Sequence, residues 1–298
     1  MNWTACILAS AVFLALYDLA KKASVKDNAV LPVLLCSTTF GFAAYAIAMW
    51  GGVTAAWGHA ALPGLLDGKV MGLAAVKSVI VATSWIFTFT ALKTLPITIA
   101  TPIRASAPAI VFLAAFFLYG ECPTVMQGVG MLCVFGGYFA FSWAGKHEGI
   151  DFLRNRAVWC AFAGMFFSAV SALFDKFVFG VCKAPVETVQ FWFQADLIVV
   201  YAVATAAVAG RRALPRQERF KFRWMIPFVG ILLAAADWLY FTGIADEAAP
   251  ISIASPLRRF SVVITFVLGA KFFHETNLRR KLIALAAILV GVAMLVWK

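Results

Sequence analysis

Three arginines lie inside stretches of the chain that are otherwise apolar. Arg104 ends the segment Pro-Ile-Thr-Ile-Ala-Thr-Pro-Ile-Arg that begins at Pro96. Arg258 ends the matching segment Pro-Ile-Ser-Ile-Ala-Ser-Pro-Leu-Arg that begins at Pro250, and Arg259 follows it directly. A guanidinium carries a planar set of donors that binds carboxylate or phosphate oxygens bidentately. Because a cation in an apolar span is costly, it normally faces a cavity or a charged partner. The pattern predicts a clamp for an anion.

Carboxylates at comparable depth offer a second explanation for these arginines. At about 1.5 Å of rise per residue, Asp18 comes within about one helical turn of the level of Arg104. Asp175 holds the corresponding place in the second half of the chain and would pair with Arg258. Such pairs would neutralise each other without any ligand. Arg259 has no counterpart in the first half, and this extra cation favours an anionic substrate.

Other polar and aromatic residues within the spans are further candidates. Carboxylates in a membrane can act as gates or in proton coupling by changing partners, and aromatic rings can wall a cavity or surround an amine. The candidate substrate-binding residues are Arg104, Arg258, Arg259, Trp85, Trp238, Tyr240 and Lys77. The candidate gating or ion-pair residues are Asp18, Asp175, Asp237 and Tyr17.

The sequence predicts neither catalysis nor a bound cofactor. It contains no G-x-S-x-G, H-E-x-x-H or P-loop motif. Its 6 cysteines have no metal-ligand spacing, and its 3 histidines form no ligand cluster. We expect no catalytic residue, no metal and no ATP-binding domain, so transport would depend on a proton gradient or on exchange with a counter-substrate.

The elements that must position these residues are membrane helices. The chain has 298 residues, of which 63% are hydrophobic, and its mean hydropathy is +0.90. This exceeds what a soluble core needs and indicates an integral membrane protein. The net charge of +11 lies mostly in short loops, where it reports membrane orientation rather than nucleic-acid binding.

Spans of about 20 apolar residues cross a bilayer, and the sequence predicts ten such helices. Most connections between them are very short, so successive helices are antiparallel neighbours. The predicted spans are 3–22, 30–50, 69–92, 96–119, 122–143, 157–180, 186–209, 222–243, 248–273 and 279–297.

A repeat relates the two halves of the chain at an offset of 154 residues, as Pro96 and Pro250 show. Since each half holds five helices, an odd number, the second half must enter the membrane with opposite orientation. The predicted fold is therefore all-α, with two inverted five-helix repeats around a central cavity. The first repeat is 1–143, the connecting loop 144–156 and the second repeat 157–298.

Lys and Arg gather on one side of the predicted helices, above all in the loop 210–221. The positive-inside rule makes that side cytoplasmic. Both termini would then lie outside, with the bacterial inner membrane as the expected location. Ten helices enclose a complete cavity, so a monomer is sufficient for transport. We expect either a monomer or a dimer.

Several motifs in the first half of the chain form a recognisable set. They are Phe87-Thr-Phe-Thr-Ala-Leu-Lys-Thr-Leu-Pro-Ile-Thr-Ile-Ala, Pro108, the Leu118-Tyr-Gly-Glu121 helix ending and the 128–137 segment between two glycines. Together they resemble the EamA type of the drug/metabolite transporter superfamily. The resemblance implies ten helices as two inverted repeats and alternating access around a cavity lined by helices 1, 3, 4, 6, 8 and 9. It also implies that the seventh helix, with Gln194, is peripheral.

Two features depart from that family, many of whose members resemble proteins with the N-terminus inside. The loop between the second and third helices, 51–68, has no Lys or Arg, whereas many members carry a basic loop there. The last helix ends at Trp297-Lys298 without a basic tail. A narrower resemblance links Arg104, Arg258 and Arg259 to the plastid triose-phosphate translocators, which exchange phosphates.

These observations lead to one main functional hypothesis and two alternatives. The first is a secondary-active transporter of a small carboxylate- or phosphate-bearing metabolite, clamped by Arg104, Arg258 and Arg259. The second is an exporter of amino acids, amines or drugs, selected by Asp18, Asp175 or Asp237 with aromatic walls. The third, a membrane scaffold or receptor without transport, leaves the costly central charges without a task.

Overall fold

Long apolar helices make up most of the computed structural model. It describes residues 2–25, 28–50, 63–94, 103, 107–120, 124–143, 155–209, 220–265, 268, 283, 286–291 and 293–294. Six helices within these ranges are long and apolar enough to cross a membrane. They are α1 (Trp3–Val25), α2 (Val30–Trp50), α3 (Gly68–Thr94), α7 (Arg156–Lys176) with its π-helical extension η2 (Phe177–Val181), α8 (Val186–Ala209) and α9 (Met225–Ala245).

Three shorter helices accompany these six: α5 (Ala107–Tyr119), α6 (Val125–Trp143) and α10 (Ile251–Arg258). Further helical residues lie at 261–265 and 286–291. Every described helix overlaps a predicted span, and the described ranges contain no strand. The all-helical class is therefore as predicted. The described residues cover only parts of the fourth, ninth and tenth spans, so the count of ten stays a prediction.

The ninth predicted span, 248–273, differs from the expectation of one continuous helix. Helix α10 ends at Arg258, Arg259 and Phe260 form a turn, and helix resumes at 261–265. Pro256 has no N–H and cannot make an ordinary helical hydrogen bond. In the turn that follows, two amides bond three residues back, from Arg259 N to Pro256 O (3.0 Å) and from Phe260 N to Leu257 O (3.1 Å). The break thus falls at the two arginines.

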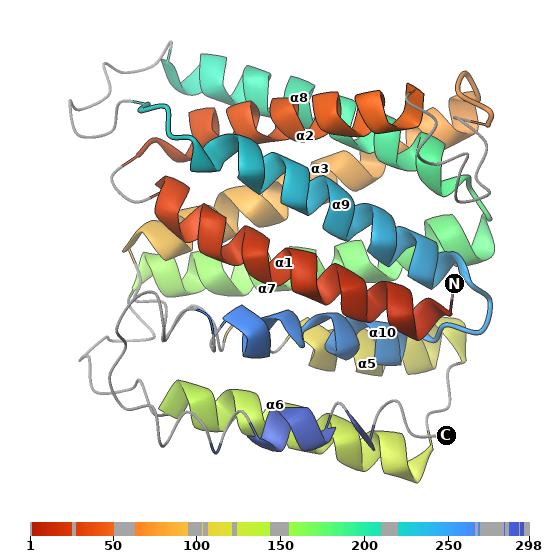
Figure 1. Cartoon of the computed structure of the whole chain (residues 1–298). Coiled ribbons are helices and arrows are strands. Elements are labelled where there is room, and N and C mark those ends of the chain that lie inside the picture. The colour runs from red at the N-terminus through yellow and green to blue at the C-terminus, as the bar shows by residue number, and fades with distance from the viewer. Residues whose placement is uncertain are drawn as a thin grey trace.

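The main helix pairs each join one helix from the first half of the chain to one from the second half (Figure 1). Helix α1 packs against α9, and the corresponding helices α7 and α3 pack against each other. The contact of α2 with α9 is matched by that of α8 with α3, and the contact of α5 with α7 by that of α10 with α1. Helices α2 and α8 meet, as do α5 and α10.

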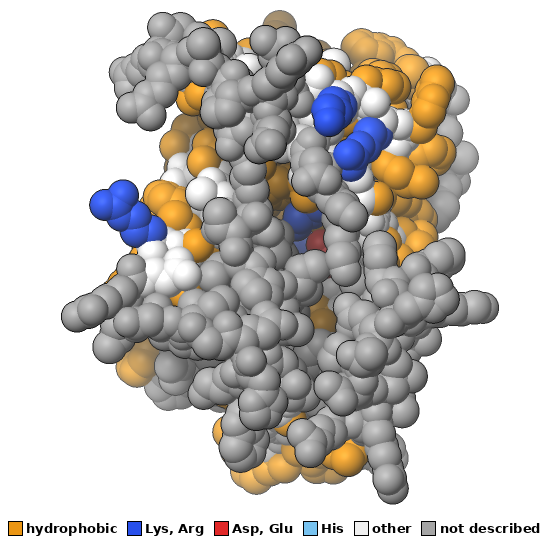
Figure 2. Space-filling model, turned by 90° about the vertical axis from the view of Figure 1, so that its left-hand side faces the viewer, with side chains coloured by type: hydrophobic (Ala, Val, Ile, Leu, Met, Phe, Trp, Pro, Cys, Tyr) orange, Lys and Arg blue, Asp and Glu red, His pale blue; other side chains and the backbone are white. Residues whose placement is uncertain are grey.

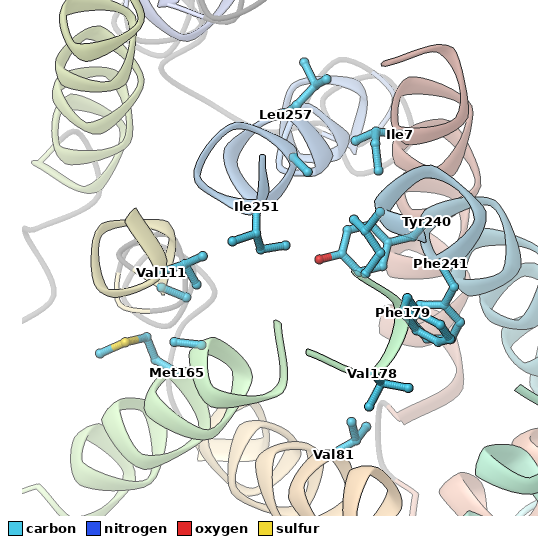
Figure 3. Packing of buried hydrophobic residues seen from close by; sticks show 14 of the residues in the cluster. Ile7, Val81, Val111, Met165, Val178, Phe179, Tyr240, Phe241, Ile251 and Leu257 are labelled. Atoms are coloured by element: carbon cyan, nitrogen blue, oxygen red, sulfur yellow. The ribbon is translucent and has the colours of Figure 1, made fainter. Parts of the chain in front are cut away.

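A core of buried side chains joins these helices around the centre (Figure 3). Phe179 of η2 stacks on Phe241 of α9 with ring centroids 4.9 Å apart, and Ile7 of α1 is fully buried in the same cluster. Helices α2 and α9 approach backbone to backbone, since a Cβ on Gly230 would lie 1.8 Å from the Ser37 carbonyl oxygen. Only glycine fits at that crossing.

Candidate functional site

A cavity of about 130 Å³ lies between α1, α3, α5, α7, α9 and α10, and Phe193 of α8 completes its wall. Figure 2 shows a hollow at the end of the molecule where α1 finishes and α9 starts, with basic and acidic atoms visible deep inside it. This volume holds several waters or a small metabolite. The charged residues that line it within the described ranges are Lys21, Lys77, Asp175, Asp237, Arg258 and Arg259.

The deepest charges form an ion pair between α3 and α7. The Lys77 ammonium donates to Asp175 Oδ1, and their side chains are 1% and 6% exposed. The ammonium also lies 4.2 Å from the ring centroid of Phe241 and 4.8 Å from that of Phe193. Two aromatic faces and one carboxylate therefore compensate Lys77 for the loss of water.

A second ion pair joins α10 to α9. The Arg258 Nη2 donates to Asp237 Oδ1, and the guanidinium lies 4.1 Å from the ring centroid of Tyr240. The side chain of Arg258 is 19% exposed, more than that of Lys77. Asp175 lies within electrostatic reach of both Asp237 and Arg258. The two pairs therefore form one buried cluster of four charges.

Two more cations stand beside this cluster. Arg259 Nη2 donates to Ser168 Oγ at 3.4 Å, across α10 and α7. The Lys21 ammonium lies 3.6 Å from Asp18 Oδ1 and over the rings of Tyr17, at 5.1 Å, and Phe89, at 4.7 Å. Both therefore contact polar or aromatic groups at the wall of the cavity.

The described lining carries four cations and two carboxylates, and a third carboxylate, that of Asp18, lies 3.6 Å from Lys21. Each of the two carboxylates is already paired with a cation, Asp175 with Lys77 and Asp237 with Arg258. Cations in an environment of low dielectric constant attract anions, and a guanidinium matches the oxygens of a carboxylate or a phosphate group.

The ion pairs differ from those that depth along the helices suggested. Asp175 was expected to pair with Arg258. Instead, Asp175 forms an ion pair with Lys77, and Arg258 forms one with Asp237. Asp18 lies within ion-pair distance of Lys21 on its own helix. Arg104, with which Asp18 was expected to pair, lies outside the described residues. Helix rotation, which depth along the axis does not reveal, decides these partners.

Most other sequence candidates come together here. Trp85, Tyr240 and Tyr17 line the cavity together with Lys77, whereas Trp238 is absent from its described lining. Sequence reasoning gave no site role to Lys21, although its position one turn after Tyr17 was a usable signal.

A smaller cavity of about 20 Å³ lies next to the first, between α2, α3, α8 and α9. It shares Trp85, Phe193, Leu233 and Asp237 with the larger one. Gln194 of α8 lines it and is 5% exposed. Helix α8 packs on α2, α3 and α9, so the interpretation of this seventh span as peripheral overlooked a buried polar residue.

Polar contacts close the opposite end of the molecule, where α7 and α9 finish. The Lys176 ammonium donates to the Ala249 carbonyl at 2.6 Å, and Lys183 donates to Glu247 on the loop after α9. This hydrogen bond from Lys183, together with its positive charge, holds the pKa of Glu247 below its ordinary value. These contacts tie the α7–α8 turn to the α9–α10 loop.

The sequence model of the EamA-like transporter family matches residues 1–143. The match covers slightly less than half of the chain. The match confirms the resemblance seen in the sequence, and together with the apolar helices it makes the protein an integral membrane protein of transporter type.

A comparison with solved structures extends the likeness in fold to the whole chain. A crystal structure whose title reads only "Crystal structure of protein" is similar with a TM-score of 0.73 and 18% sequence identity. The similarity covers 98% of this chain and 97% of that one. At this identity the likeness concerns the fold alone. No curated protein matches the chain.

Proposed function

We propose that this protein is a secondary-active transporter of a small organic anion that carries a carboxylate or a phosphate group. The observation that carries the proposal is the adjacent pair of guanidiniums, Arg258 and Arg259, that line the cavity at the level of a broken helix. Arg258 and Arg259 would clamp the anion from α10, with Arg104 as the expected third member. Broken helices beside a cavity are a recurrent feature of transporter binding sites.

Ten helices in two inverted repeats are the architecture that we propose for this activity. Helix α1 packs on α9, and the equivalent helices of the other half, α7 and α3, pack on each other in the same way. A two-fold axis in the membrane plane would produce this correspondence. The hollow lies at the end of the molecule that bears the predicted cytoplasmic loops, and polar contacts tie the other end. We propose an inward-facing state, with both termini outside a bacterial inner membrane.

The second candidate is export of an amine or amino acid held by Asp175 or Asp237. Both carboxylates already face a cation, so an amine would have to displace an ammonium or a guanidinium. A positively charged cavity also repels an amine. Trp85 and Tyr240 in the wall favour this candidate only by offering aromatic faces.

The test is thermal stabilisation of the purified protein by a panel of carboxylates, phosphates, zwitterions and amines. A ligand at a hundred times its Kd stabilises the native state by about 2.7 kcal/mol. We expect anions to raise Tm in the wild type and not in Arg258→Ala. Arg156→Ala, which removes an exposed charge at the start of α7, is the matched control and should respond like the wild type.

Two results would contradict the anion clamp. One is anion stabilisation that persists in Arg258→Ala. The other is stabilisation by amines that is lost in Asp175→Asn. The double variant Arg258→Ala/Asp237→Asn leaves no unpaired carboxylate, so it separates loss of the clamp from loss of folding.

A further inference from the structure

The smaller cavity brings four oxygen-bearing side chains together among apolar neighbours. They are Ser37 and Thr38 of α2, Gln194 of α8 and Asp237 of α9. Empty cavities in protein interiors are normally lined by apolar groups alone. Its volume of about 20 Å³ corresponds to a single water-sized occupant.

Gln194 supplies an independent sign that something binds there. The side chain is buried, and its Oε1 has no hydrogen-bond partner within the described structure. A buried amide oxygen without a partner carries the full cost of its desolvation. The Oε1 of Gln190, one turn earlier on α8, likewise has no partner within the described structure, and its Nε2 donates to the Ala234 carbonyl at 2.7 Å. Of the two glutamines, Gln194 is the one that lines the cavity.

The position of this small cavity suits an ion that has left bulk water. Thr38 and Gln194 each lie eight residues into their helices, or about 12 Å along the axis. Asp237 is likewise near the middle of α9. The site is therefore near the centre of a membrane about 30 Å thick. The glycine crossing of α2 and α9, at Gly41 and Gly230, forms one wall.

We propose that this cavity is a binding site for a small monovalent cation, with Na⁺ as the ion of matching size. Carboxylate, carbonyl and hydroxyl oxygens are the ligands that hard cations prefer. Gln194 Oε1 and the Asp237 carboxylate are the principal ligands, and Ser37 and Thr38 complete the set.

The site is linked to the anion cavity because Asp237 lines both cavities. Its Oδ1 accepts from Arg258, so a cation beside the same carboxylate weakens the hold of Asp237 on the guanidinium. Arg258 then becomes more available to an anion in the larger cavity, and an anion on Arg258 leaves Asp237 freer for the cation. The two ligands therefore bind cooperatively, and this coupling step rests on the proposed function.

The cation site can be tested without any anionic substrate. Purified full-length protein in lipid nanodiscs is unfolded by heat while NaCl replaces choline chloride at constant ionic strength. We expect Tm to rise with Na⁺ and to saturate. Gln194→Leu and the nearly isosteric Thr38→Val should each raise the midpoint concentration of Na⁺ at least tenfold.

Two matched controls separate ligand loss from general destabilisation. Thr39→Val removes the neighbouring exposed hydroxyl, which bonds to the Leu35 carbonyl, and should keep the wild-type midpoint. Gln190→Leu lowers Tm by losing its bond to Ala234 but should keep the response to Na⁺. Equal Tm in Na⁺ and choline, or a wild-type midpoint in both Gln194→Leu and Thr38→Val, would overturn the site. A Tm that follows pH and ignores Na⁺ would replace the cation by a proton on Asp237.

The coupling is tested with inorganic phosphate and succinate as anion probes. Linkage requires that an anion lower the Na⁺ midpoint by the same factor by which Na⁺ lowers the anion midpoint. Independent midpoints would overturn the coupling. A response to Na⁺ without any response to anions would refute the anion clamp and leave the cation site standing, so the two failures are distinguishable.

Discussion

The ion pair between Lys77 and Asp175 offers the most informative perturbation of the central cluster. Both side chains are almost fully buried, and the pair joins α3 to α7. Removing one partner of such a pair costs about 3–5 kcal/mol, because the other charge stays buried without compensation. Replacing both partners by neutral residues of similar size is often neutral or stabilising.

We therefore expect Lys77→Met and Asp175→Asn to be severely destabilised as single variants and the double variant to recover most of the loss. At about 2–4 °C per kcal/mol, each single variant loses on the order of 10 °C in Tm. The aromatic contacts of Lys77 with Phe193 and Phe241 make Lys77→Met the more damaging of the two. The assay is thermal unfolding of the four proteins of the cycle in one detergent.

Additive losses would refute the reasoning, because contacting groups must show an interaction energy in a double-mutant cycle. The same proteins separate static pairing from gating. If the pair is only structural, the double variant transports at the wild-type rate once it is stable. If Asp175 changes partners during the cycle, the double variant stays folded and loses transport.

Three further predictions concern packing, the closed end and orientation. Gly230→Ala must push α2 from α9, because its Cβ would lie 1.8 Å from the Ser37 carbonyl oxygen; we expect a loss of about 1–3 kcal/mol in stability, while Gly72→Ala, with open space around it, should lose none. Lys183 lowers the pKa of Glu247, so their ion pair stabilises above the ordinary Glu pKa of about 4.3 and is lost as the pH falls through the lowered value; Glu247→Gln should remove this part of the acid-induced fall in Tm, and an unchanged acid profile would exclude the pair. Lys298→Cys should react with an impermeant thiol reagent in intact cells, and reaction only after permeabilisation would reverse the proposed orientation.

The sequence was sufficient to predict the helices because a membrane span depends on the total hydropathy of its residues. About 20 apolar residues in a row specify a crossing, and exact packing hardly matters to that prediction. Pro256 lacks the N–H that an ordinary helical hydrogen bond needs and can kink the helix just before Arg258. The turn at Arg259 and Phe260 goes further than a kink, because the following hydrogen bonds tighten to a spacing of three residues.

The partners of the buried charges could not be predicted, because they depend on how each helix is rotated about its axis. Depth placed Asp175 near Arg258, yet α3 turns Lys77 toward Asp175, and α9 turns Asp237 toward Arg258. The role of Gln194 was missed for another reason. The family resemblance made its helix peripheral, although Gln190 and Gln194 recur at helical spacing on an otherwise apolar segment and indicated a buried face.

The scaffold follows a repeat, whereas the charges of the site do not. At the offset of 154 residues, Lys77 corresponds to Ile231 and Asp237 to Thr83. Each ion pair therefore joins a charge that the repeat does not duplicate to one that it does, since Arg258 matches Arg104 at this offset and Asp175 matches Asp18 at an offset of 157 residues. A duplicated scaffold supplies two equivalent sets of helices that can rock against each other. The unduplicated residues Lys77, Asp237 and Arg259 make the charges of the cavity asymmetric, as the binding of a single substrate between the halves would require under the proposed function.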